Sequence, residues 1–315
     1  MVWFRALRSR TGLLRAASRL LAAGLVVYLG VRLWQLWDKH PIDFHTANAG
    51  LFVLGVVDGA FAITAFALAW TVILRRLGIA ARPGWIEIWF KSQLGKYLPG
   101  SVWQYAGRVT LGRRRGIPVQ ISLASIGVEV VASLAAAAIV SALALPLAYG
   151  FAAWTAGVLL CGVVYAFRGG IMATAERLAA PALARVDRST VAASLRAVPV
   201  AVGLYLVTWV LYGTAFWLTA HALFAVPASD LLHYIGVFAV AWVAGYVVVF
   251  APGGIGVREA VLVGLLSSRL GEAHAIALAG ASRLVLSAID LGCGAGALAL
   301  PLLHRSWRKP AGAAE

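Results

Sequence analysis

The sequence predicts an all-α, polytopic integral membrane protein, a single bundle of about eight transmembrane helices. Of its 315 residues, 62% are hydrophobic and only 12% are charged, and the mean hydropathy is +0.86. An average soluble domain carries roughly 25% charged residues, so this chain has too few to cover a soluble surface. The apolar runs are also longer than the alternating segments of about ten residues that form membrane β-barrels, which favours helices.

The apolar runs, taken in order, predict the crossings. They lie at residues 20–37, 50–74, 119–149, 151–167, 198–223, 231–249, 260–266 and 275–303. No small-residue cleavage site follows the first run, so we interpret it as a retained helix rather than a signal peptide. We therefore expect one transmembrane domain over 20–303, between a basic N-terminal segment (1–19) and a short tail (304–315).

The basic residues predict the orientation. Of the 27 Lys and Arg residues, 22 lie in four segments that would share one side of the membrane: 1–19, 75–115, 168–196 and 304–315. The loops expected on the other side contain only Lys39. By the positive-inside rule, both termini are expected in the cytoplasm and the protein in the inner (cytoplasmic) cell membrane. The net charge of +15 then reflects topology and does not call for a nucleic-acid partner.

Two segments cannot continue as ordinary crossing helices. Residues 84–107 contain Pro99-Gly100 and have cytoplasmic-type charge on both sides, so they form either an interfacial amphipathic helix or a re-entrant hairpin. Residues 251–266 begin with a proline and three glycines within an apolar run, which predicts a discontinuous or re-entrant helix. At membrane depth, such a break is tolerated only where it is buried in protein or lines a cavity.

The second break is a candidate binding site. Gly253, Gly254 and Gly256 would let the backbone approach a ligand closely, and the N–H groups at the start of the next helix would face an anion. Arg258 adds a positive charge, and Glu259 follows it. The alternative is a tight interhelical loop in which Arg258 pairs with Glu259 or extends to the interface.

The first break is a possible counterpart, because Lys96, Pro99 and Gly100 also combine a Pro-Gly pair with nearby positive charge. Interrupted helices at corresponding places in two halves of a chain are typical of inverted-repeat transporters. The alternative is an interfacial helix whose lysines contact anionic lipid headgroups.

Beyond Arg32, near the end of the first run, four charged residues lie within apolar runs. Asp58, Glu129, Arg283 and Asp290 are costly there and should face the bundle interior. Glu129 has no basic residue nearby in its own run, so it is a candidate for a polar path or for headgroup recognition. Arg283 and Asp290 lie two turns apart on nearly the same helix face, which favours a structural pair. Asp58 lies between Gly55 and Gly59, a spacing that favours close helix packing.

Catalytic and metal-binding patterns are not evident in the sequence. His221 and His233, with Asp230, fit no metal or triad template, and the two cysteines lie in apolar stretches. A nucleotide-binding Gly-x-x-x-x-Gly-Lys-[Ser/Thr] motif is absent as well. We therefore expect no enzyme activity, no catalytic residues, no cofactor and no metal.

Three stretches give the sequence a family resemblance. The KxxLGKYLPGxVW pattern of residues 91–103, the run around Glu129, and PGGIGVREA at 252–260 resemble the membrane region of bacterial lysylphosphatidylglycerol synthase/flippases. The resemblance covers roughly residues 15–303. It implies a lipid-handling membrane fold with phospholipid as partner. In the best-known members a separate C-terminal aminoacyltransferase domain makes the lipid, and this sequence ends at Glu315, so lipid synthesis is not expected of it.

The function expected from the sequence is therefore flippase-like: binding or translocation of an anionic or modified phospholipid, or of a lipid-linked headgroup. This hypothesis predicts a headgroup-sized polar cavity that contains Arg258 and Glu129. The alternatives are an integral-membrane enzyme acting on lipid-linked substrates, or an accessory scaffold whose 168–196 loop docks a separately encoded lipid-modifying enzyme.

Overall fold

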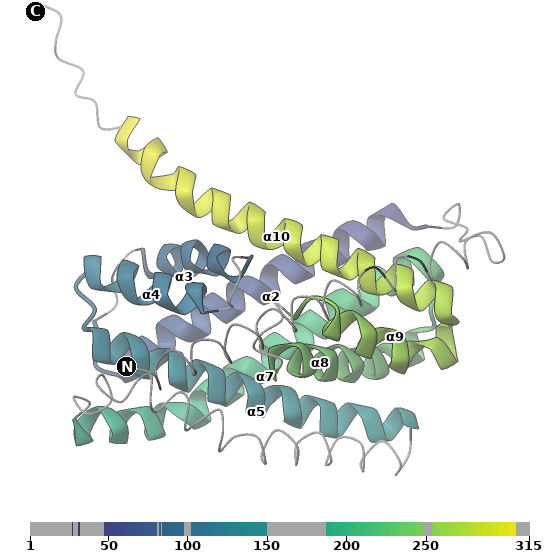
Figure 1. Cartoon of the computed structure of the whole chain (residues 1–315), viewed down its shortest axis with the longest axis horizontal. Coiled ribbons are helices and arrows are strands. Elements are labelled where there is room, and N and C mark those ends of the chain that lie inside the picture. The colour runs from purple at the N-terminus through teal and green to yellow at the C-terminus, as the bar shows by residue number, and fades with distance from the viewer. Residues whose placement is uncertain are drawn as a thin grey trace, which may run out of the picture.

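A computed structural model of the chain describes residues 47–80, 82, 84–97, 102–149, 187–247 and 254–306, together with the single positions Val27 and Val31. Within these ranges every regular element is helical, which confirms the predicted fold class (Figure 1). In chain order the elements are α2 (Ala49–Arg76), α3 (Trp85–Gln93), η1 (Leu94–Tyr97), α4 (Trp103–Arg114), α5 (Val119–Tyr149), α7 (Arg188–Phe224), η2 (Ala228–Asp230), α8 (Leu231–Val247), α9 (Val257–Leu270) and α10 (Glu272–Ser306). The crossings predicted at 20–37 and 151–167 and the segment 1–19 lie outside the described residues.

Five of the described helices are long and apolar enough to cross a membrane: α2, α5, α7, α10, and α8 together with η2. The helix α9 stands where the short seventh crossing was predicted. It has 14 residues, about 21 Å at 1.5 Å per residue. A bilayer's hydrocarbon core is about 30 Å thick. We conclude that α9 is too short to cross by itself.

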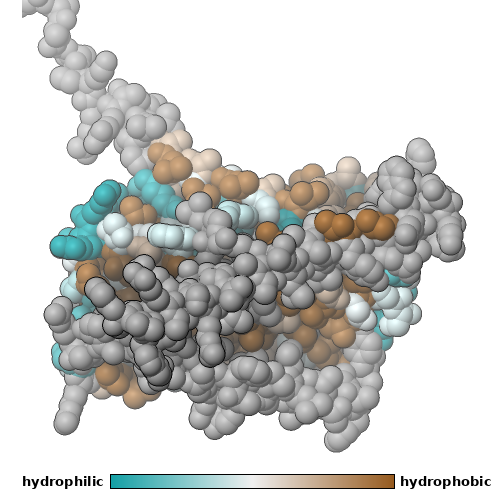
Figure 2. Space-filling model, in the orientation of Figure 1, coloured by the Kyte–Doolittle hydropathy of each residue, from teal (hydrophilic) through white to brown (hydrophobic). Residues whose placement is uncertain are grey.

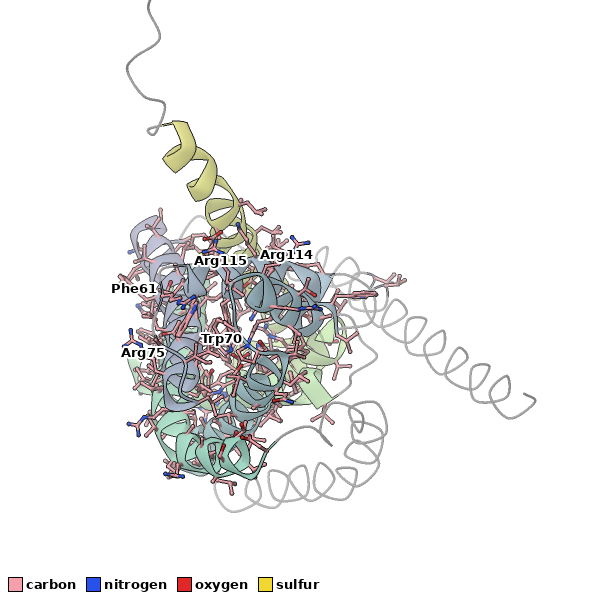
Figure 3. All side chains as sticks on the ribbon, turned by 90° about the vertical axis from the view of Figure 1, so that its left-hand side faces the viewer. Phe61, Trp70, Arg75, Arg114 and Arg115 are labelled. Carbon is pink, nitrogen blue, oxygen red and sulfur yellow. The ribbon has the colours of Figure 1, made fainter. Side chains whose placement is uncertain are left out.

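The surface is divided in the way a membrane helix bundle requires. In Figure 2, hydrophilic residues gather at the left-hand end, over α3 and α4, with a smaller group at the opposite end and mostly hydrophobic residues between them. Figure 3 looks toward the left-hand end and shows Arg75, Arg114 and Arg115 there. The arginine at the end of α2 and the arginines at the end of α4 therefore lie at the same end of the molecule.

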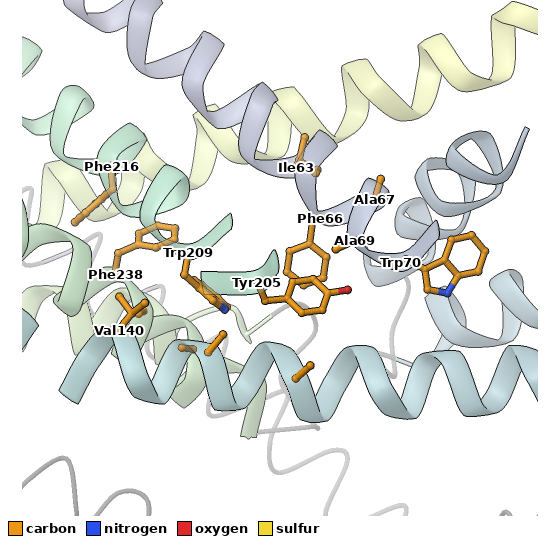
Figure 4. Packing of buried hydrophobic residues seen from close by; sticks show 14 of the residues in the cluster. Ile63, Phe66, Ala67, Ala69, Trp70, Val140, Tyr205, Trp209, Phe216 and Phe238 are labelled. Atoms are coloured by element: carbon orange, nitrogen blue, oxygen red, sulfur yellow. The ribbon is translucent and has the colours of Figure 1, made fainter. Parts of the chain in front are cut away.

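The core is built around α7, which packs against α2, α5 and α8. Figure 4 shows its aromatic side chains, among them Tyr205 and Trp209, between the neighbouring helices. Both are completely buried, as is Trp70 of α2. Each buried indole N–H has an acceptor: Trp70 Nε1 donates to Ser125 Oγ (3.0 Å), and Trp209 Nε1 donates to the carbonyl oxygen of Ser133 (2.9 Å). These bonds offset the cost of burying a polar N–H among apolar groups.

Two glycines allow α2 to approach its neighbours closely, as their spacing predicted. A Cβ on Gly55 would lie 3.2 Å from the Cβ of Leu218 on α7. A Cβ on Gly59 would lie 2.9 Å from Cδ1 of Ile289 on α10. The Gly55-x-x-x-Gly59 pair therefore serves helix packing.

The segment 84–107 enters a helical hairpin, which we call the first hairpin (α3, η1 and α4). Its two arms pack antiparallel: Ser92 lies against Gly107, and Gly95 lies against the start of α4, where a Cβ on Gly95 would be 2.6 Å from the backbone nitrogen of Gln104. The α3 side chains Trp85, Ile88, Trp89 and Phe90 are buried and belong to the main core. The two arms therefore lie side by side and pack into the bundle, as the hairpin alternative predicts. Whether the hairpin re-enters the membrane stays a prediction.

Helices α8 and α9 form the second hairpin. At one end Arg269 pairs with Asp230 (Nη1 to Oδ1, 3.2 Å), and at the other end Gly254 lies against Gly245, where a Cβ on Gly254 would be 3.0 Å from the Gly245 Cα. Gly254 has a φ of 69°, which favours glycine on conformational grounds as well. Helix α8 ends at Val247 and α9 begins at Val257, so the predicted interruption occurs where the proline and glycines stand.

Helix α10 connects the two hairpins. It runs along the molecule in Figure 1, passing α3 and α4 on the left and α9 on the right. It contacts α9 and also α3 and η1. The contact with η1 is tight, because a Cβ on Gly294 would lie 2.6 Å from Cδ2 of Leu94. One continuous helix thus contacts both interrupted segments.

Candidate functional site

The start of α9 is organised by Glu259. Its Oε2 accepts a hydrogen bond from the backbone nitrogen of Gly256 (2.6 Å), the reciprocal bond of a capping box. Gly256 has a φ of 87°, a conformation that side-chain-bearing residues seldom adopt. Glu259 therefore stabilises a helix start whose sharp turn needs glycine. Of the glycines predicted here, Gly253 lies outside the described residues.

Arg258 is buried in the first turn of this helix. Only 7% of the residue is exposed, and its guanidinium carbon lies 4.5 Å from the centre of the Phe238 ring on α8. Its Cβ packs against Gly245. The alternative in which Arg258 pairs with Glu259 or extends to the interface is wrong, because Glu259 binds other groups and Nη2 of Arg258 is buried without a hydrogen-bond partner. Burial, and after it the neighbouring charge of Arg283, lowers the pKa of Arg258 to about 10, so the side chain is charged at neutral pH.

The two charged residues in the middle of α10 each have a partner on a hairpin. Arg283 Nη1 lies 3.3 Å from Oε1 of Glu259. Asp290 forms an ion pair with Lys96 of the first hairpin. Both charges are therefore compensated by residues outside α10, which the spacing of Arg283 and Asp290 did not predict.

Tyr97 completes the contact between α10 and the first hairpin. Its hydroxyl donates to Oδ2 of Asp290 (3.0 Å). Burial, and then the charge of Asp290, raises the pKa of Tyr97 to about 12, so the hydroxyl keeps its proton at neutral pH. Asp290 thus accepts from Tyr97 and pairs with Lys96 at once. Lys96 is thus attached to α10, and its side chain is 27% exposed. The predicted contact of Lys96 with lipid headgroups stays a prediction.

We call six residues the hairpin cluster: Lys96, Tyr97, Glu259, Arg283 and Asp290, which join α10 to the hairpins, and Arg258, which is next to Glu259 in α9. Its members come from η1, α9 and α10, segments as much as 194 positions apart in sequence. Pro99 and Gly100, predicted as the turn of the first hairpin, lie outside the described residues. Tyr97 was not predicted as a site residue, although its position beside Lys96 in the KYLPG stretch was a signal available in the sequence.

Glu129 lies in a second buried cluster. Arg108 Nη1 on α4 lies 2.7 Å from its Oε2, and Trp89 Nε1 donates to the same oxygen (3.3 Å). The Arg108 guanidinium lies between two indole rings, 5.2 Å from the centre of Trp70 and 5.4 Å from that of Trp89. Arg108 Nε donates to Ser92 Oγ (3.3 Å), so this cluster fastens both arms of the first hairpin to α5.

Arg108 was missed as a partner of Glu129. In the sequence it counts among the basic residues of 75–115, where it resembles a topology signal. No local pattern in the sequence separates it from the other basic residues of that segment. Its side chain is fully buried, unlike that of Arg115, which is 48% exposed.

The described residues do not place Glu129 and Arg258 in one polar cavity. No hydrogen bond or ion pair joins them in the described ranges, and each belongs to its own cluster. Helix α8 connects the two regions instead. Gly245 packs against Arg258, and the next residue, Tyr246, shares a hydrogen bond with the hydroxyl of Tyr105 on α4 (2.7 Å).

The remaining predicted polar residues stand apart from these clusters. Asp58 is half-buried on α2, and its Oδ2 has no hydrogen-bond partner. Asp230 pairs with Arg269, and His221 Nδ1 lies 2.5 Å from the carbonyl oxygen of Val226. Within the described ranges no three His, Cys, Asp or Glu residues are grouped as a metal site would require.

The sequence was compared with models of known protein families. The family model of the lysylphosphatidylglycerol synthase TM region matches residues 16–293. The chain belongs to this family. The match includes both hairpins and, on α10, Arg283 and Asp290, so the hairpin cluster lies entirely within the family region. Searches of curated proteins and of solved structures found no match to the chain.

Proposed function

We propose that this protein binds a membrane lipid by its headgroup inside the bilayer and moves it between the two leaflets. Membership of the lysylphosphatidylglycerol synthase TM-region family supports a lipid-related role in a membrane. The observation that carries the proposal is the hairpin cluster, where two interrupted helices approach α10 and are attached to it by ion pairs. Interrupted helices that expose backbone groups and charge at membrane depth are the usual binding elements of transporters.

The distribution of charge supports a model in which the two hairpins enter the membrane from opposite sides. If the basic end formed by Arg75, Arg114 and Arg115 is cytoplasmic, the first hairpin begins and ends on the cytoplasmic side of the inner membrane. The second hairpin then begins at Asp230 and ends at Arg269 on the outer side. A headgroup at α10 would be reached from one side along the first hairpin and from the other along the second.

The ion pairs give this arrangement a means of opening. Lys96–Asp290 and Arg283–Glu259 attach different hairpins to α10, so either hairpin can separate while the other stays bound. Both pairs are partly buried, with side chains 8–27% exposed. A charged headgroup can replace the partner of the same sign in such a pair, since the exchange then keeps the remaining charge compensated.

Lipid retention tests the proposal. The full chain is purified in mild detergent, and the lipids that remain bound are identified by native mass spectrometry, alongside an unrelated membrane protein of similar size prepared from the same cells. We expect a defined number of lipids to stay bound and to be enriched over their share of the membrane. Retention of lipid in membrane proportions only would contradict the proposal.

A further inference from the structure

The two hairpins meet directly at a pair of tyrosines. The hydroxyl of Tyr105 on α4 lies 2.7 Å from the hydroxyl of Tyr246 on α8, and either group can be the donor. Tyr105 belongs to the first hairpin and Tyr246 to the second, 141 positions later in the sequence. Neither residue is in the hairpin cluster or among the predicted site residues. The contact therefore joins the hairpins without passing through α10.

Each tyrosine is held in position by its neighbours. Tyr105 precedes Arg108 by three residues, so the two lie on one side of α4, and Arg108 is bound to Glu129 of α5 at 2.7 Å. The Tyr246 ring stacks on that of Trp242, one turn earlier in α8, with ring centres 5.5 Å apart and planes at 11°. The packing thus directs both hydroxyls to their meeting point. A phenylalanine at either position would keep the ring and remove only the hydrogen bond.

Tyr246 lies where a movement of α8 would reach the interrupted part of the second hairpin. It is in the last turn of α8, which ends at Val247. A Cβ on the preceding residue, Gly245, would lie 3.3 Å from the Arg258 Cβ and 3.4 Å from the Gly254 Cα. A displacement of α4 that carried Tyr246 with it would therefore also displace the start of α9. The tyrosine pair thus links the first hairpin to the break in the second.

The tyrosine pair is also the weaker of two attachments of α4. The side chains of Arg108 and Glu129 are 0% and 6% exposed, and separating ions so deeply buried is costly. A bond between two neutral hydroxyls shifts an equilibrium between closed and open forms by only about two- to tenfold. The tyrosine contact can therefore open and close while α4 stays attached to α5.

We propose that Tyr105 and Tyr246 form a latch that holds the two hairpins together, and that release of the latch is a step in each movement of lipid between the leaflets. The second part of this inference rests on the proposed function. While the latch is closed, the first hairpin and the last turn of α8 stay in contact. Once it opens, the hairpins separate at this point, and a headgroup brought along one hairpin reaches the other.

Hydrogen–deuterium exchange of the full chain in detergent tests the latch without any movement of lipid. The variants are Tyr105→Phe, Tyr246→Phe and the double substitution. Backbone amides in the last turn of α8 should exchange about two- to tenfold faster in Tyr105→Phe, although the substitution is on another helix. The double variant should match the single ones, because the same bond is lost in all three.

Tyr205→Phe is the matched control. Tyr205 is completely buried on α7, and its hydroxyl has no hydrogen-bond partner. Removing this hydroxyl should leave the exchange of α8 at the wild-type rate. If Tyr105→Phe also leaves it unchanged, the latch is overturned. A double variant whose exchange is faster than that of both single variants would overturn it as well, since the two hydroxyls would then act separately.

The rate of lipid movement tests the second part. In liposomes that contain the full chain and a fluorescent phospholipid, all three latch variants should expose the inner-leaflet label about two- to tenfold faster than the wild type. Tyr205→Phe should equal the wild type. A contact that only stabilises the fold would lower the Tm of the latch variants without raising this rate, and that result would overturn the second part.

The outcomes separate this inference from the proposed function. If the wild type moves lipid and the latch variants move it at the same rate, the proposed function stands and release of the latch is not a step in it. If the wild type moves no lipid but the exchange of α8 responds as expected, the proposed function fails and the latch between the hairpins stands.

Discussion

Replacing Arg108 by methionine would remove the cation that pairs with the buried Glu129 carboxylate. Among the described residues, the indole N–H of Trp89 would then be the hydrogen-bond donor left to that carboxylate. The Arg108 side chain is 0% exposed and that of Glu129 is 6% exposed, with 2.7 Å between Nη1 and Oε2. Removing one partner from a pair so deeply buried typically costs about 3–5 kcal/mol, because the other charge stays in a medium that cannot solvate it. Arg108→Met should therefore lower the free energy of unfolding by roughly that amount.

The assay is equilibrium unfolding in mixed micelles with an increasing fraction of dodecyl sulfate, followed by near-ultraviolet circular dichroism. Arg115→Gln serves as the matched control, because Arg115 lies just beyond the same helix but its side chain is 48% exposed in its pair with Glu87. That exposed pair should contribute no more than about 1 kcal/mol.

The double substitution Arg108→Met with Glu129→Leu separates the burial of a charge from a general loss of packing. With both charges gone, most of the lost stability should return, since an apolar pair of similar volume costs little in the same place. The reasoning is refuted if Arg108→Met is as stable as the wild type. It is also refuted if the double variant is no more stable than the single one.

Two further predictions use glycines that differ in their surroundings. Gly294→Leu should destabilise the protein by about 1–3 kcal/mol, because a Cβ at this position would lie 2.6 Å from the Leu94 side chain. Gly292→Leu should have a much smaller effect, because a Cβ there would have nothing within 4 Å. The same unfolding assay measures both variants. Gly254→Ala should be destabilising through its φ of 69° and its contact with α8, whereas Gly264→Ala, in an open position within α9, should raise stability by a few tenths of a kcal/mol to about 1 kcal/mol. Equal effects at the two members of either pair would contradict these packing assignments.

The sequence was sufficient to predict those features of the protein that depend on a short stretch of residues. Composition and the lengths of the apolar runs were sufficient for the helical membrane fold. Proline and glycine predicted that 84–107 and 251–266 would not continue as ordinary crossing helices. Motifs in the same two segments gave the family. Each of these signals is contained in a short stretch of chain, so no knowledge of tertiary contacts was needed.

The pairing of the buried charges could not be predicted in this way. Helical periodicity placed Arg283 and Asp290 on nearly the same face, but it could not show that each has a partner on a hairpin. Those partners come from elements that fold back against α10, and their positions depend on how the hairpins pack. Arg108 was hidden for the same reason, because a basic residue in a basic segment has no local feature that reports burial.

The proposal that the protein moves lipid between leaflets is tested most directly in liposomes. Vesicles with and without the purified full chain carry a trace of fluorescent phosphatidylglycerol, and a reductant that cannot cross the membrane is added outside. We predict that label from the inner leaflet becomes accessible in vesicles containing the wild type, and more slowly with Asp290→Asn, which loses the ion pair with Lys96. If the label in wild-type vesicles stays as protected as in protein-free vesicles, the proposal is contradicted.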